Sequence, residues 1–65
     1  MDNYMDNYTK DDLDEALRSI TSMIQTCEKS QEKIRKGTPQ HSVLSDRIKA
    51  LEIAAQTITN LIKRY

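Results

Sequence analysis

Apolar residues recur at alternating steps of four and three positions in two long stretches of this sequence. The first stretch carries Leu13, Leu17, Ile20, Ile24 and Cys27 and, beyond a polar residue at Gln31, Ile34. The second stretch carries Leu44, Ile48, Leu51, Ala55, Ile58, Ile62 and Tyr65. Such spacing averages about 3.5 residues, which places each series along one face of a helix that packs lengthwise against another helix. We call the two series the main seams, and they predict two long amphipathic helices.

Cap and turn signals stand before and between the two series. Thr9, with Asp12 three residues later, is typical of a helix N-cap. Gly37 suits the left-handed residue that closes a helix, Thr38 is a second N-cap, and Pro39 fits a first helical position. The predicted fold class is therefore all-α, an antiparallel two-helix hairpin of coiled-coil type in which Tyr65 returns near the start of the first helix. Its expected parts are a flexible segment at 1–9 and a hairpin domain over 10–65, with a helix at 10–36, a turn at 37–38 and a helix at 39–64.

The chain is too short to bury a large core on its own. It has 65 residues, and its single cysteine excludes an internal disulfide, so oligomerisation is the remaining common source of stability. A second apolar series runs beside the main seam of the second helix. This series, the surplus stripe, consists of Val43, Ala50, Ala54 and Leu61. We expect the hairpins to assemble through it into a homo-oligomeric helical bundle, such as a four-helix dimer.

Gln31 interrupts the first main seam with a polar side chain. A polar residue at such a position commonly fixes register or subunit number, and contact with a ligand inside an assembly is the alternative. Gln31 therefore joins the surplus stripe in the predicted oligomer interface. On the first helix, Ala16, Met23 and Ser30 form a weaker line at seven-residue spacing beside the main seam.

The formal net charge of zero hides an uneven distribution. Residues 1–28 carry seven acids and two bases, whereas residues 29–65 carry eight bases and three acids. Acids at a helix start and bases at its end complement the helix dipole, which is a sufficient structural explanation. The alternative is a basic end that binds an anion. A lone cysteine indicates a reducing compartment, and no apolar stretch approaches the roughly 20 residues that span a bilayer, so we expect a cytoplasmic protein without a membrane partner.

No arrangement of residues in this sequence is typical of an enzyme. Cys27 falls in the middle of a helix on an apolar seam, where a small buried residue is the plain interpretation. His41 is the only histidine and the acids at 11–15 form a solvated first turn, so neither a metal nor a cofactor is expected. Direct DNA recognition is not expected either. Seams that persist along whole helices require near-antiparallel packing, whereas a helix-turn-helix needs a steep crossing.

The turn and the tyrosine before the first helix supply the candidates for ligand binding. Thr38 and His41 lie at a helix N-terminus, a place that attracts phosphate or carboxylate, although many capped turns have such residues and His41 can simply face solvent. Basic residues nearby would add positive charge. Tyr8 could stack on a base, although capping the open end of the bundle is an alternative role for a terminal tyrosine. The predicted ligand-binding residues are Tyr8, Arg35, Lys36, Thr38, His41 and Arg47.

Residues 45–58 read Ser-Asp-Arg-Ile-Lys-Ala-Leu-Glu-Ile-Ala-Ala-Gln-Thr-Ile and contain the pattern Leu51-Glu52-Ile53-Ala54. This stretch, about a fifth of the chain, resembles the second helix of small bacteriophage helical-hairpin proteins that sequester cyclic-nucleotide signals and inhibit CBASS or Thoeris immunity. In that family a long helix with a Leu-Glu-x-Ala pattern packs against its antiparallel partner and against other subunits. The resemblance implies an oligomeric sponge for a nucleotide signal, and no ligand-contacting motif of the family aligns with this chain.

Together these features predict a non-enzymatic, homo-oligomeric binding protein that captures a small phosphorylated nucleotide signal between subunits. A phage-encoded inhibitor of host immunity is the form that the resemblance implies. The alternative is a helical interaction module, an adaptor or inhibitor, that docks its surplus stripe on a host protein. A nucleic-acid accessory factor is a third interpretation. The expected partners are thus a second copy of the chain, a small anionic ligand, or a host protein.

Overall fold

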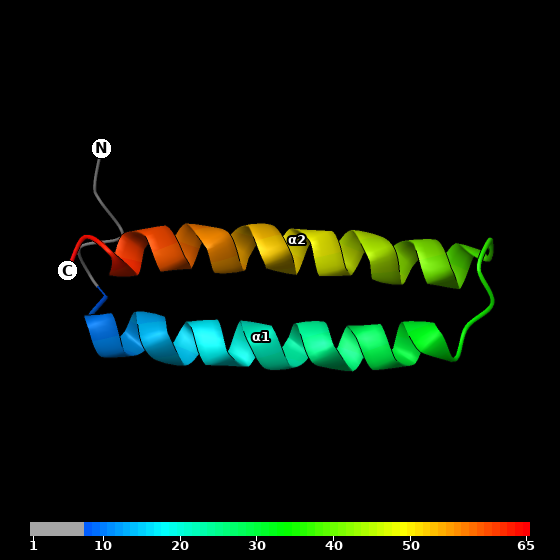
Figure 1. Ribbon diagram of the computed structural model, residues 1–65, viewed down its shortest axis with the longest axis horizontal. Coiled ribbons are helices and arrows are strands. Elements are labelled where there is room, and N and C mark those ends of the chain that lie inside the picture. The colour runs from blue at the N-terminus through cyan, green and yellow to red at the C-terminus, as the bar shows by residue number, and fades with distance from the viewer. Residues whose placement is uncertain (1–7) are drawn as a thin grey trace.

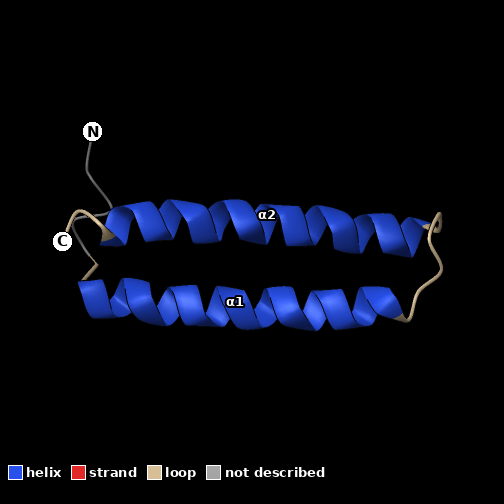
Figure 2. Ribbon diagram, viewed as in Figure 1, coloured by secondary structure: helices blue, strands red, loops and turns tan. Residues whose placement is uncertain are grey.

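The computed structural model describes residues 8–65 as two long helices joined by one loop. Helix α1 spans Lys10–Glu32, helix α2 spans Pro39–Ile62, and the loop consists of residues 33–38. Figure 1 shows the helices side by side and antiparallel, with the loop at one end, the loop end, and the C-terminus at the other, the open end. Figure 2 shows that the described part contains helices and loops but no strand. The predicted all-α hairpin is confirmed, and of the segment 1–9, expected to be flexible, only the last two residues are described.

Both helices begin at the predicted caps. The hydroxyl oxygen of Thr9 accepts from the backbone N–H of Asp12 at 3.0 Å, and the Asp12 carboxylate accepts from the N–H of Thr9 at 3.0 Å. This reciprocal pair is a capping box. At the start of α2, the hydroxyl oxygen of Thr38 accepts from the N–H of His41 at 3.2 Å, and Pro39 is the first helical residue. Local hydrogen bonding therefore determines where each helix starts.

Helix α1 ends at Glu32, earlier than the predicted end at residue 36. Its last turn tightens, because the N–H groups of the next two residues donate to carbonyls three positions back. Within the loop, the Arg35 carbonyl accepts from the Thr38 hydroxyl at 2.9 Å, and this hydrogen bond stabilises the loop conformation. Gly37 has the left-handed φ of +89° within this loop and not directly after the helix. The glycine marks the loop correctly, but it does not mark the helix end.

The two helices form a single layer with little enclosed core. Leu13, at 8% exposure, is the only buried side chain among the described residues, and the other main-seam residues are half-buried apart from the exposed Tyr65. The structure extends 42 × 23 × 15 Å, and its thickness is close to the roughly 10–12 Å diameter of one helix. Stable domains usually bury their apolar faces between two layers. The main seams meet each other as predicted, and the flanks of both helices remain open.

Side-chain hydrogen bonds join the helices at both ends. Near the loop, the Gln31 amide nitrogen donates to the His41 carbonyl at 3.2 Å and to the Ser45 hydroxyl at 2.5 Å. At the open end, the Tyr65 hydroxyl donates to the Tyr8 carbonyl at 2.5 Å. The return of the C-terminal tyrosine to the start of α1 agrees with the prediction. Helix α2 itself ends at Ile62, two residues before its predicted end, in a short terminal turn.

Candidate functional site

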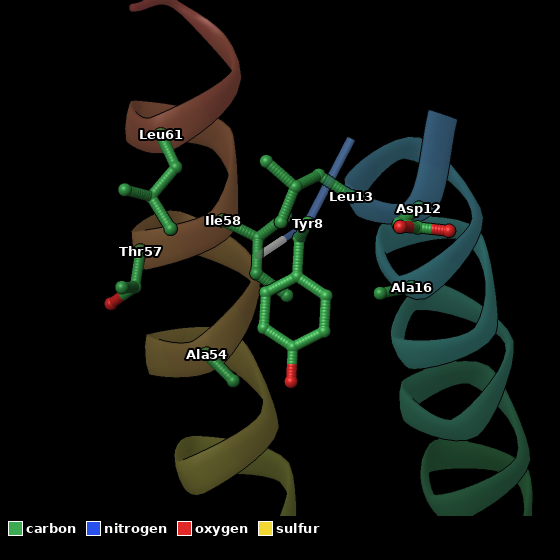
Figure 3. A pocket seen from close by; sticks show the side chains of 8 residues that line it. All are labelled: Tyr8, Asp12, Leu13, Ala16, Ala54, Thr57, Ile58 and Leu61. Atoms are coloured by element: carbon green, nitrogen blue, oxygen red, sulfur yellow. The ribbon is translucent and has the colours of Figure 1, made fainter. Parts of the chain in front are cut away.

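A groove of about 700 Å³ opens between the helices at the open end. Its lining residues are Tyr8, Asp12, Leu13 and Ala16 from the first half of the hairpin and Ala54, Thr57, Ile58 and Leu61 from α2. Figure 3 shows the ring of Tyr8 in the space between the two helices, beside Leu13 and Ile58. We call this feature the open-end groove. It combines an apolar floor with one aromatic ring and one carboxylate.

A second groove, of about 440 Å³, lies nearer the middle of the hairpin. Its lining residues are Ser22, Met23, Thr26 and Cys27 from α1 and Arg47, Ala50 and Leu51 from α2. Arg47 stands one heptad before Ala54 of the open-end groove, and Met23 stands one heptad after Ala16. Residues seven apart lie on the same side of a coiled-coil helix, so the two grooves lie along one face of the hairpin. We call it the groove face.

The opposite face of the hairpin is polar. By helical periodicity it carries Lys10, Asp14, Thr21, Gln25 and Glu28 from α1 and Ser45, Glu52, Gln56 and Thr59 from α2. Lys10 and Asp14 form an ion pair there, with Nζ 3.7 Å from the carboxylate oxygen. The hairpin therefore has one polar face and one face, the groove face, whose grooves are lined mostly by apolar side chains.

The predicted surplus stripe lies on the groove face. Ala50, Ala54 and Leu61 line the grooves, and Val43 stands one heptad before Ala50. Val43 is 52% exposed. Met23, which lines the middle groove opposite Ala50, is 47% exposed. These residues are placed where an interface needs them, and assembly through them stays a prediction.

Gln31, the other predicted interface residue, uses its amide inside the hairpin. Its two hydrogen bonds go to the backbone of His41 and the side chain of Ser45, both on α2. A displaced α2 would lose both bonds, so they favour one register of the two helices. This geometry supports the register interpretation of the polar interruption, whereas a role in subunit number stays a prediction.

The six predicted ligand-binding residues are spread along the whole hairpin. Arg35, Lys36, Thr38 and His41 lie at the loop end, and Arg47 lines the middle groove. Tyr8 lies in the open-end groove, at the far end of a molecule 42 Å long. A single hairpin therefore does not bring Tyr8 together with the residues of the loop.

The hydrogen-bonding groups of the turn are largely used by the turn itself. The Thr38 hydroxyl accepts from His41 and donates to the Arg35 carbonyl, while the Thr38 carbonyl accepts from the Ser42 N–H at 3.2 Å. Pro39 has no N–H to offer. Helix N-termini attract anions through free N–H groups, and this cap already satisfies several of them. Anion binding at the turn would depend mainly on side-chain charge.

The sequence-based site omitted the α1 side of the grooves. Asp12, Ala16 and Met23 line the grooves from α1. The sequence feature that indicates this side is the seven-residue spacing of Ala16, Met23 and Ser30. The signal is weak because alanine and serine add little apolar surface. Only the packed hairpin shows that this line and the surplus stripe border the same grooves.

Within residues 8–65, neither helix is long and apolar enough to cross a membrane. The same part of the chain holds no cluster of three or more His, Cys, Asp or Glu residues that could bind a metal ion. Comparison with protein-family models, with curated proteins and with solved structures finds no match to this chain. Function must therefore be inferred from the groove face itself.

Proposed function

We propose that this chain is a non-enzymatic binding protein that works as a homo-oligomer, with the groove face of one hairpin buried against another hairpin. The observation that supports the proposal is the single-layer architecture, in which Leu13 alone is buried among residues 8–65. A hairpin with one polar face and one apolar face needs a second layer on the apolar side.

The exposed side chains of the groove face supply the driving force. Full burial of a side chain such as Val or Met contributes about 1.5–3 kcal/mol, and Val43 and Met23 are each about half exposed. Roughly 1 kcal/mol thus remains to be gained at each position, and a symmetric pair gains it twice. Half-buried Ala54 and Leu61 add to this sum, and Ala50 allows a neighbouring helix to approach closely.

Native mass in solution tests the proposal, with two glutamate variants of neighbouring residues. Ala54→Glu places a charge in the open-end groove, whereas Ile53→Glu places the same charge at a position that lines neither groove and is 59% exposed. Burying a charge at an interface costs several kcal/mol, so the Ala54→Glu variant should have the mass of a monomer where the wild type has the mass of an oligomer. Ile53→Glu should keep the wild-type mass. A monomeric wild type at all concentrations, or equal masses of the two variants, would contradict the proposal.

Sequestration of a nucleotide signal is a second candidate function, and the open-end groove favours it. Its volume of about 700 Å³ lies within the roughly 300–1,000 Å³ of small-molecule sites, and Tyr8 supplies a ring on which a base could stack. Binding alone would be enough for a protein that inhibits host immunity, as the resemblance of residues 45–58 implies. In that role the protein would be a phage-encoded cytoplasmic sponge that needs no cofactor.

Thermal shift against cyclic nucleotides and ADP-ribose derivatives tests this second function. A ligand at 100 times its Kd stabilises the native state by about 2.7 kcal/mol, a shift of roughly 10–20 °C in a domain of this size. Tyr8→Ala should abolish the shift, and Tyr8→Phe should preserve it because stacking needs only the ring. Absence of a shift with every nucleotide, together with a host protein that co-purifies, would instead support docking on a protein. Salt-sensitive binding to random duplex DNA would support the accessory-factor alternative.

A further inference from the structure

We infer that the partner of the groove face is a second copy whose loop lies at the opposite end, so that each open-end groove is completed by the basic loop of its partner. This inference rests on the proposed self-association and adds its orientation. Two isologous arrangements place groove face on groove face. With loops at opposite ends, α1 stacks on the partner's α1 and α2 on the partner's α2. With loops at the same end, α1 stacks on the partner's α2.

Charge distinguishes the two arrangements. At the open end, the four acids of residues 11–15 stand beside the bases Lys10, Lys63 and Arg64, so the charges there nearly balance. At the loop end, residues 29–36 contain four bases and one acid, and all four bases are exposed. Loops at the same end would bring two sets of four bases together, and like charges in proximity repel. Loops at opposite ends separate the two sets of bases and place each set beside the nearly balanced open end of the other copy.

The contacts between α1 and α2 give the register of such a pair. Met23 and Ala50 line the same groove and therefore stand at the same level, close to the middle of both helices. A two-fold axis at this level maps the first turn of α1 onto the partner's residues 33–36. The axis also brings Ala50 close to its own copy, where a small side chain allows α2 and the partner's α2 to approach closely.

This arrangement brings Tyr8 of one copy together with two of the predicted loop-end residues of the other. The Tyr8 ring and apolar floor of one open-end groove would lie beside the exposed Arg35 and Lys36 of the partner. Each dimer would contain two such composite sites, and neither site is complete in a single chain. The chemical class that fits is a flat aromatic molecule whose edge carries hydrogen-bonding groups, because the ring stacks, the Asp12 carboxylate of the groove accepts and the two cations donate.

Disulfide trapping tests the orientation. All variants carry Cys27→Ser, so that only the introduced cysteines react. With loops at opposite ends, Ala50→Cys should form a disulfide with its own copy, as should Met23→Cys, while a mixture of the two should give no mixed disulfide beyond background. A mixed disulfide between these two variants without self-linking would show loops at the same end. That result overturns the orientation and leaves the proposed self-association intact, whereas loss of all cross-links in a monomeric protein overturns the proposed function itself.

A second cross-link tests the composite site without a ligand. In the same Cys27→Ser background, Tyr8→Cys and Lys36→Cys are mixed and treated with a short bis-maleimide. The composite site predicts a covalent heterodimer, and Thr21→Cys, on the polar face of α1, serves as the matched control that should not join to Lys36→Cys. A yield no higher than that of the control would refute the composite site, even where the Ala50→Cys disulfide forms.

Discussion

Leu13→Ala is the substitution whose cost the structure defines best. Leu13 is the only buried side chain among the described residues, and it borders the open-end groove. The change removes about three carbons at roughly 0.8 kcal/mol each, so the transfer free energy alone costs about 2 kcal/mol. Leucine and alanine are both good helix formers, so little of the loss comes from helix propensity.

The state of the open-end groove decides how much more is lost. If the groove is open to water, solvent fills the space and the cost stays near 2 kcal/mol. If a second copy covers the groove, the truncation leaves an enclosed cavity, and the cost rises to about 3–5 kcal/mol. Leu13→Ala therefore reports whether the native protein in solution has a covered groove.

Urea unfolding followed by circular dichroism, at one fixed protein concentration, measures this cost. Leu17→Ala is the matched control, since Leu17 is a half-buried leucine of the same main seam that lines neither groove. We expect the control to lose about 1 kcal/mol, since only about half of the side chain leaves water on folding. A Leu13→Ala cost no larger than that of Leu17→Ala would refute the assignment of the core to this position.

Substitutions at four further positions test the local structure. Thr9→Ala should cost about 1 kcal/mol by removing the capping box of α1, while Thr9→Ser should retain most of it, as thermal melts would show. Gly37→Ala should cost about 1–2 kcal/mol because alanine rarely adopts a φ of +89°, and this backbone strain is the whole cost, since an added Cβ meets nothing within 4 Å. Gly37→Asn should cost less. Equal melting temperatures for both variants and the wild type would contradict the expected strain. Gln31→Ala and Ser45→Ala should be non-additive, with a coupling of about 0.5–1 kcal/mol in a double-mutant cycle of unfolding free energies, and additivity would mean that their 2.5 Å hydrogen bond contributes nothing.

The helices and their starts could be predicted because their signals are local. The four–three spacing of the main seams defines the helices, and Thr9 and Thr38 act on N–H groups only three residues away. The end of α1 could not be placed in the same way. Thr38 closes the loop by hydrogen bonding to the Arg35 carbonyl. Gly37 indicates a left-handed residue, but it does not indicate how many residues separate it from the end of the helix.

The candidate site was harder to predict, because it depends on where distant residues meet. The surplus stripe was found from α2 alone, but its partner line through Ala16 and Met23 becomes significant only when both helices border the same grooves. Tyr8 and Arg35 were each reasonable ligand contacts by residue type. Their separation along the hairpin follows from helix length, and the sequence pattern does not state which ends belong to the same site.

The scarcity of buried side chains in the hairpin has a consequence for the cell. If hairpins complete their core only by pairing, folding is a second-order process. The folded fraction then depends on the concentration of the protein in the cell. At low expression most copies would stay unfolded and open to proteolysis. Above a threshold copy number, folding, resistance to degradation and binding activity would appear together, so the abundance of the protein would act as its own switch.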